Sequence, residues 1–428
     1  MREEIRIATL TLEAIEKRGF SFNKAFKRAC SKAKIRNPYI KLKAYEIAYK
    51  TLTKVYLSDY YLKVKKTDSI HLRRKCAFRV AFSLILDGVL SAKSLRRYTG
   101  GLLSRKLLNI LEDLTEDFLE SMLEELEPIK RLSIKYSHPK WLVSTLLSYM
   151  DYRNVESLLK ANSIPTRWIR INTLKINSER GYRKLESQGV LVEPDRDFPN
   201  LYKIIESKKP LDEIKGVKDG YFIIQDKASV ATVYELSPSK GDIILDATTA
   251  PGLKAQLISE LTEDRVILIA VDVSETRLRQ AKQLLSLYNV KNVDLVLSDS
   301  TKIKVRAIDK VLIDPPCSNS GAIRKDPALR ITLRDTSNLK RYLDTQKSLI
   351  KNLMHINIRD YIVYSTCSIL PEECESIIDK LVEERLLLKC HAGTVRGYRG
   401  FFSSNYTVRY FPHIHDTIGF FICKFRGR

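Results

Sequence analysis

IILDATTAPGLK occupies residues 243–254 and leads into residues of helical character up to Leu261. An apolar run, a turn of small residues and a helix together form the start of a βα unit. Helical segments then alternate with further strand-like runs, at 266–271, 293–297, 310–313 and 361–365, with a closing run at 419–425. This alternation predicts an α/β domain, Rossmann-like in class, built on a parallel sheet.

Two of these strand-like runs end in a cysteine. VLIDPPCS at 311–318 contains Asp314 and Cys317, and YIVYSTCS at 361–368 contains Cys367. Ligands of a parallel α/β sheet bind outside the carboxyl ends of the strands, so we expect both sulfurs to face one crevice. Two thiols beside an aspartate suit attack on an electron-poor ring followed by release from it.

Carboxylates follow the neighbouring strands: Asp246, Asp272 and Asp299. An acid at the second strand end can accept hydrogen bonds from both ribose hydroxyls, and one at the third can accept from the amine of adenine. Each aspartate alone could equally cap a helix. The turn after Asp246 can bind an anionic group through backbone N–H donors, but it lacks the glycines of a dinucleotide or Walker loop. S-adenosylmethionine is therefore favoured as the cofactor.

Methylation of carbon 5 of cytosine needs such a set of groups. A thiolate adds to carbon 6 and makes carbon 5 nucleophilic. Asp314 supplies an acid near ring nitrogen 3, and a second thiol or a water-linked base assists release. The base must be unstacked to be reached. Methylation of an exocyclic amine stays open because its enzymes also carry an Asp-Pro-Pro turn, followed there by an aromatic residue. Methylation of DNA stays open too.

Positive charge is concentrated near the amino terminus. The net charge is +23, and residues 1–100 contain 24 Lys and Arg against 8 Asp and Glu. This asymmetry favours a nucleic-acid partner, with an anionic membrane surface or plain solubility as alternatives. Helical spacing over residues 1–130, broken at glycines and prolines, predicts an all-helical domain; the breaks are Gly19, Pro38, Gly88, Gly100 and Gly101.

The remaining chain divides into two predicted parts. Residues 131–224 combine a helical segment at 139–149 with short strand-like runs and read as a small α+β module, and residues 225–428 form the catalytic domain. No run is long and apolar enough for a membrane span, and the charged amino terminus lacks a signal sequence. Seven cysteines without a Cys-x-x-Cys pair indicate free thiols and no metal site. We expect a cytoplasmic monomer.

Several motifs, in order, resemble the RNA 5-methylcytosine methyltransferase family, most closely its Sun/Fmu branch, which acts on ribosomal RNA. The similarity covers nearly the whole chain and is carried by SHPKW at 137–141, RINT at 170–173, QDKAS at 225–229, the turn at 246–254, DPPC at 314–317, STCS at 365–368, PEE at 371–373, RYFPH at 409–413 and GFF at 419–421.

The resemblance implies a NusB-like RNA-binding domain at 1–130, a ferredoxin-like RNA-binding module at 131–224 and a Rossmann-like catalytic domain at 225–428. It implies Cys367 as the nucleophile and Cys317 as the thiol needed for product release. The full candidate catalytic set is Cys367, Cys317, Asp314 and Lys254. The candidate S-adenosylmethionine contacts are Thr248, Thr249, Ala250, Pro251, Gly252, Leu253, Lys254, Asp272, Arg277, Asp299 and Asp314.

The chain departs from the family pattern at Thr249, Leu253, Asn319 and Cys374. The usual turn of the family has alanine in place of Thr249 and glycine in place of Leu253. The Leu253 side chain is therefore expected to weaken cofactor binding. Other functions stay open at this point: an RNA-binding or assembly factor with an idle catalytic fold, and a methyltransferase acting on transfer RNA.

Overall fold

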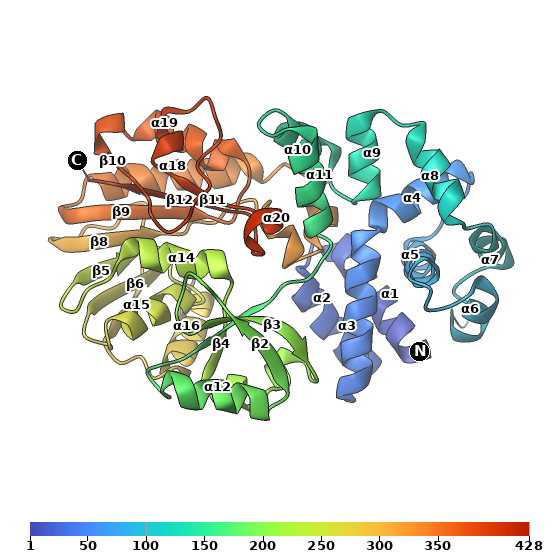
Figure 1. Cartoon of the computed structure of the whole chain (residues 1–428), viewed down its shortest axis with the longest axis horizontal. Helices are drawn as coiled ribbons and strands as arrows, with labels where there is room; N and C mark the ends of the chain where they lie inside the picture. The colour runs from blue at the N-terminus through green and yellow to red at the C-terminus, as the bar shows by residue number, and fades with distance from the viewer. Residues whose placement is uncertain (100, 428) are drawn as a thin grey trace. The chain divides into compact units, whose positions relative to one another are not determined.

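The computed structural model describes residues 1–99 and 101–427 (Figure 1). Gly100, one of the predicted helix breaks, and Arg428 lie outside the described residues. The chain forms two compact units. One contains residues 1–165 together with 323–336, and the other contains residues 166–322 and 337–428.

The first unit is helical, as its apolar spacing predicts. Its helices up to residue 124 are α1 (Arg2–Arg18), α2 (Phe22–Ala33), α3 (Pro38–Thr53), α4 (Val55–Val64), α5 (Leu72–Leu86), α6 (Ala92–Thr99), α7 (Arg105–Glu112) and α8 (Glu116–Glu124). Gly19 ends α1 in the left-handed conformation, with φ 59°, which glycine adopts without steric cost. Pro38 is the first residue of α3, where its missing N–H has no helical partner to lose.

Three further helices of this unit follow: α9 (Pro128–Lys135), α10 (Lys140–Leu147) and α11 (Tyr152–Ala161). The helical segment predicted at 139–149 is α10, and it belongs to the helical unit.

A segment from far along the chain completes the core of the helical unit. Residues 323–336, which include α17 (Leu329–Thr332), pack among the amino-terminal helices. The Tyr49 hydroxyl donates to the Arg324 carbonyl at 2.8 Å, and the Tyr56 hydroxyl donates to the Arg330 carbonyl at 2.7 Å. The helical core therefore includes a piece of the sequence that lies between two strands of the second unit.

The second unit begins with a small antiparallel sheet in the order β2-β3-β1-β4. Its strands are β1 (Trp168–Ile171), β2 (Val190–Pro194), β3 (Leu201–Ser207) and β4 (Phe222–Ile224), accompanied by α12 (Ser178–Ser187) and α13 (Lys215–Lys218). Ile169, Ile171 and Phe222 are fully buried in the core of this module. The strand-like runs predicted between 168 and 205 are confirmed.

The larger sheet of this unit has the order β10-β12-β9-β8-β5-β6-β7, with β11 beside β12. Its strands are β5 (Ile243–Asp246), β6 (Ile267–Asp272), β7 (Val293–Leu297), β8 (Ile308–Ile313), β9 (Ile358–Thr366), β10 (Leu387–Leu388), β11 (Val408–Tyr410) and β12 (Phe420–Phe425). β5 to β9 pair in parallel, and β12 joins β9 antiparallel. Each strand predicted within residues 225–428 is confirmed, with small shifts at the ends.

Helices cover both faces of this sheet (Figure 1). One set is α14 (Lys227–Leu236), α15 (Leu253–Leu261) and α16 (Glu275–Leu287), and the other is α18 (Leu339–Met354) and α19 (Glu375–Leu381). The chain leaves β5 toward β6 on one side and returns to β8 on the other. Such a reversal of strand order opens a crevice at the carboxyl ends of the strands. No helix in the described part of the chain is long and apolar enough to span a bilayer.

Two glycines let the loops at this crevice approach closely. The Gly419 N–H donates to the Gly321 carbonyl at 2.8 Å, and the Gly321 N–H donates to the Cys367 carbonyl at 3.0 Å. A Cβ atom at Gly321 would collide with the backbone of Gly419.

Gly321→Ala should therefore lower the free energy of unfolding by about 3 kcal/mol, since the collision is with backbone that cannot rotate away. Gly427→Ala is the matched control, because its Cβ would meet neighbours no closer than 3.5 Å; it should change the stability by less than about 0.5 kcal/mol. Urea unfolding of both variants measures the difference, and equal stabilities would contradict the close approach.

Candidate functional site

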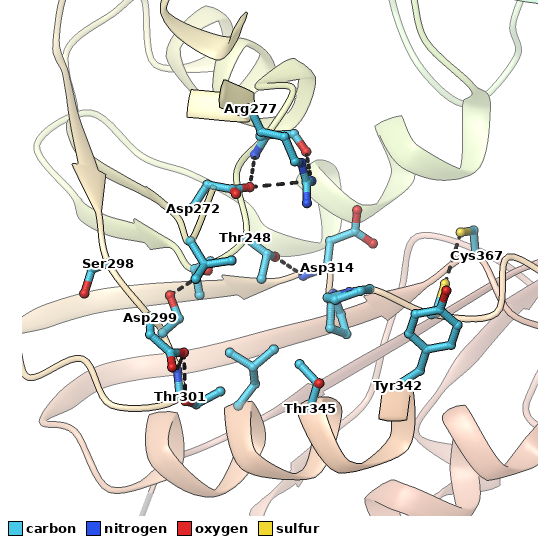
Figure 2. A pocket seen from close by; sticks show the side chains of 18 of the residues that line it. Thr248, Asp272, Arg277, Ser298, Asp299, Thr301, Asp314, Tyr342, Thr345 and Cys367 are labelled. Atoms are coloured by element: carbon cyan, nitrogen blue, oxygen red, sulfur yellow. Dashed lines mark hydrogen bonds and ion pairs between the residues drawn. The ribbon is translucent and has the colours of Figure 1, made fainter. Parts of the chain in front are cut away.

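A cleft of about 350 Å³ opens at the carboxyl ends of the central strands, within the second unit (Figure 2). Asp272 and Asp299 lie at one end of the cleft and Cys367 at the other, with Asp314 between them. It is lined by Ala247, Thr248, Ala250, Asp272, Val273, Arg277, Ser298, Asp299, Ser300, Thr301, Asp314, Pro315, Pro316, Cys317, Asn319, Tyr342, Thr345, Leu349 and Cys367.

Asp272, at the end of β6, organises the carboxylate end. Its Oδ1 accepts a hydrogen bond from the Ser274 N–H at 2.9 Å, and its Oδ2 accepts from the Ala250 N–H at 3.3 Å. Arg277 lies 3.5 Å from the same oxygen and donates to the Ala250 carbonyl at 2.7 Å. Asp272 and Arg277 thus fix the backbone of the turn that follows β5.

Asp299 faces the same cleft after β7. Its Oδ1 accepts from the backbone N–H and the hydroxyl of Thr301, at 2.9 and 2.7 Å. These hydrogen bonds lower the pKa of Asp299, so it is charged at neutral pH. Asp246 differs, because it is 1% exposed and burial raises its pKa to about 6. Two of the three strand-end aspartates therefore open onto the cleft.

The turn at 247–252 contributes only part of its length to the cleft wall. Thr248 and Ala250 line it, and the Thr248 hydroxyl accepts from the Asp314 N–H at 2.9 Å. Among the described residues, five candidate cofactor contacts are absent from the lining: Thr249, Pro251, Gly252, Leu253 and Lys254. Leu253 is the first residue of α15.

The two thiols meet at the opposite end. The Sγ atoms of Cys317 and Cys367 are 3.3 Å apart. Cys367 is partly exposed, whereas Cys317 is 4% exposed. The Cys367 thiol donates to Oδ1 of Asn319 at 2.8 Å. One sulfur is therefore accessible from the cleft and the other lies behind it.

A buried carboxylate supports the Cys317 loop. Glu373 is fully buried; its Oε1 accepts from the Ser318 N–H at 2.9 Å and from the Gln346 amide at 3.0 Å, and its Oε2 accepts from the Ser318 hydroxyl at 2.5 Å. The hydrogen bond with Cys367, burial and the negative charge of Glu373 raise the pKa of the Cys317 thiol well above its usual value. Cys317 is therefore protonated at neutral pH.

Lys254 and Asp314 form an ion pair beside the thiols. The Ser365 hydroxyl donates to the other Asp314 oxygen at 3.3 Å. Burial opposes the charge on Lys254, but the Asp314 carboxylate outweighs it and raises the pKa of Lys254. Lys254 therefore stays an ammonium. It is not part of the cleft lining, but it contacts Asp314, which is.

Several residues of the site have no role that the sequence indicates. In the sequence, Asn319 is a departure from the family pattern and Glu373 is part of the PEE motif, and neither position points to a function. Tyr342 and Thr345 project into the cleft from α18 (Figure 2), and their region carries no strand-end signal that could have identified them. In the described part of the chain, no group of three or more His, Cys, Asp or Glu side chains is arranged to hold a metal.

Two protein-family models match this chain. The one described as 16S rRNA methyltransferase RsmB/F matches residues 233–426. The other, described as the ferredoxin-like domain of RsmF/B-like methyltransferases, matches residues 138–205.

Curated proteins show the same relationship. The chain is 30% identical over 315 residues to a human 28S rRNA (cytosine(4447)-C(5))-methyltransferase, covering 69% of this chain and 39% of that protein. It is 29% identical over 326 residues to ribosomal RNA small subunit methyltransferase B of Pectobacterium carotovorum, covering 74% and 73%. The chain thus spans about two fifths of the human relative.

A solved structure matches along the full length. The crystal structure of PH0851 has a TM-score of 0.80 and 25% identity, and the match covers 100% of this chain and 99% of that one.

The strand order and the paired thiols are those of a Rossmann-like methyltransferase domain. A ferredoxin-like module precedes it in the chain. The chain belongs to the RsmB/F methyltransferase family. Its amino-terminal helical unit is consistent with the NusB-like domain that the resemblance implies.

Iodoacetamide should label the native protein once, at Cys367. The other cysteines are buried, and alkylation needs an accessible thiolate. Peptide mapping by mass spectrometry after mild treatment at pH 8 measures the sites, and Cys367→Ala should take up no label. Early labelling of Cys317 would contradict its burial behind Cys367.

Proposed function

We propose that this chain is an S-adenosylmethionine-dependent methyltransferase that modifies carbon 5 of a cytosine in RNA. The observation that carries the proposal is the 3.3 Å approach of the Cys317 and Cys367 sulfurs beside Asp314 in one cleft. An amine methyltransferase has no use for a second thiol at this place. The family match supports the same chemistry.

The carboxylate end of the cleft suits S-adenosylmethionine. Asp272 and Asp299 can accept from ribose hydroxyls and from the adenine amine, and Asp246 keeps one buried oxygen without a hydrogen-bond partner behind the turn. Thr248, Ala250, Arg277 and Asp314 complete the side that would hold the cofactor. When bound, S-adenosylmethionine supplies an electrophilic methyl group.

Cys367 is the nucleophile in this proposal because it is the accessible sulfur. The partly exposed Cys367 thiol gives its proton to solvent. Its thiolate then adds to carbon 6 of the cytosine, and the ring electrons shift so that carbon 5 becomes nucleophilic. Ring nitrogen 3 then needs a proton. The Lys254 ammonium, paired with Asp314, can supply it through that carboxyl group.

Release requires the reverse movement of electrons. Once carbon 5 carries the methyl group, its proton passes to the Cys317 sulfur as the Cys317 thiol proton passes to Cys367; the C–H electron pair forms the C5=C6 bond, and the C6–S pair returns to Cys367. The Cys317 thiol lies 3.3 Å from the departing sulfur and can donate its proton to it. The high pKa of Cys317 keeps that proton in place until this step.

Ribosomal RNA is the proposed substrate, because the named relatives act on ribosomal RNA; transfer RNA is the alternative. We propose that residues 1–130 and 131–224 dock the RNA while 225–428 carries the chemistry. A cytosolic location keeps the seven thiols reduced, and we propose a monomer as the working form.

Cys367→Ala should abolish methyl transfer, with a loss of more than about a thousandfold, because no adduct can form. Cys317→Ala should instead accumulate a covalent protein–RNA adduct, since addition proceeds and release fails. Transfer of a radiolabelled methyl group to cellular RNA measures the first effect, and a shifted band on a denaturing gel measures the second.

Cys390→Ala serves as the control, because this cysteine is buried outside the cleft lining; it should retain activity and form no stable adduct. Full activity in Cys367→Ala would refute the proposed mechanism. Mass analysis of the modified nucleoside distinguishes 5-methylcytosine from an amine-methylated base.

Asp272→Asn should weaken S-adenosylmethionine binding about tenfold or more, because an amide accepts weaker hydrogen bonds than a carboxylate. Asp294→Asn removes the same charge from an exposed position of β7 outside the cleft lining and should bind normally. Calorimetric titration with the cofactor measures both, and equal affinities would remove Asp272 from the cofactor site.

A further inference from the structure

A long segment of the helical unit is purely basic. Between residues 17 and 45 the sequence contains ten Lys and Arg and no Asp or Glu. The segment runs from the end of α1 through α2 into α3. Lys24, Arg28 and Lys32 are exposed and recur every four residues along α2, so they share one face of the helix.

This basic face borders a groove between α1 and α2. Its volume is about 160 Å³, and its lining consists of Leu10, Glu13, Ala14, Lys17, Arg18, Arg28, Ala29 and Lys32. Its lining combines three small or apolar side chains with four cationic ones. The groove is therefore a concave, positively charged surface.

Most of this charge is not neutralised. Glu13, the acidic residue of the lining, pairs with Lys17 at 2.7 Å. Among the described residues, Arg18, Arg28 and Lys32 form no ion pair, and all three are exposed. Three free cations around one groove repel one another unless an anion joins them, and this favours an anionic ligand.

Aromatic side chains accompany the cations. Lys24 and Arg28 lie over the Phe20 ring, at 4.4 and 5.9 Å from its centroid. Tyr39, at the start of α3, is 72% exposed, which is unusual for an aromatic residue. Its neighbour Ile40 packs against the apolar cluster that contains the groove residues Leu10 and Ala29. The residue that follows Tyr39 is thus anchored in the same cluster as two residues of the groove.

We propose that the groove between α1 and α2 binds the phosphodiester backbone of a single-stranded RNA segment, with Tyr39 stacking on one of its unpaired bases. Arg18, Arg28 and Lys32 contact the phosphates. Cations beside an exposed aromatic ring are the combination with which proteins hold single strands. The proposal rests on the proposed function for its choice of RNA over a protein partner, and it names where that RNA docks.

The test uses the full chain and a fluorescent 20-nucleotide oligouridine, which contains no cytosine for the catalytic site. Arg28→Glu with Lys32→Glu should weaken binding about tenfold or more at 100 mM salt. The slope of log affinity against log salt should fall by about 1.4, since two phosphate contacts are lost from a single strand. Fluorescence anisotropy across a salt series measures both quantities.

Arg153→Glu with Lys160→Glu is the matched control, because it makes the same charge change at exposed positions of α11 in the same unit. It should alter the affinity less than twofold. If both double variants weaken binding equally, or if neither weakens it, the groove is not the RNA site. In the second case a protein partner would be left as the ligand of this surface.

Tyr39→Ala should weaken oligouridine binding about fivefold, whereas Tyr39→Phe should keep the affinity of the unmodified protein, because stacking needs the ring and not the hydroxyl. An unchanged affinity in Tyr39→Ala would refute the stacking. Cofactor titration of the groove variant separates this proposal from the catalytic one. We expect unchanged S-adenosylmethionine binding and a raised KM for RNA with kcat kept; a lost cofactor affinity would show misfolding and overturn the assignment.

Discussion

Strands β8 and β9 lie side by side and run in the same direction, with Ile313 opposite Tyr364. Because parallel neighbours end at the same edge of a sheet, the loops after them emerge together, and the Cys317 and Cys367 sulfurs come within 3.3 Å. The Gly321 N–H then bonds the Cys367 carbonyl and ties the loops to each other. The proposed chemistry depends on this pairing, since an antiparallel arrangement would send the two cysteines to opposite ends of the sheet.

A buried charge holds that arrangement in place. Glu373 satisfies its two oxygens with donors from Ser318 and Gln346, which offsets much of the cost of burying a carboxylate. The same charge acts on Cys317 and helps to keep its thiol protonated. One side chain therefore shapes the loop and helps to keep the Cys317 thiol protonated.

Charge is divided between distinct regions of the protein. The cleft at the strand ends presents acidic groups, one arginine and two thiols, whereas the α1–α2 groove presents four cations against one acid. An acidic cleft repels a polyanion, so the proposed RNA would need to be held by another surface. The basic helical unit can supply such a surface. It includes residues 323–336, which lie between β8 and β9 in the sequence.

The sequence by itself determined the order of strands and helices, the placement of Cys317 and Cys367 after neighbouring strands, and the basic character of the first hundred residues. These are local properties, because periodicity and composition act over a few residues. Only the tertiary structure decided that Glu373 and Gln346 support Cys317. It also decided that Asp246 is buried while Asp272 and Asp299 face the cleft, and that residues 323–336 join the helical unit. Those outcomes depend on which distant side chains pack together, and one segment read alone does not contain its partners.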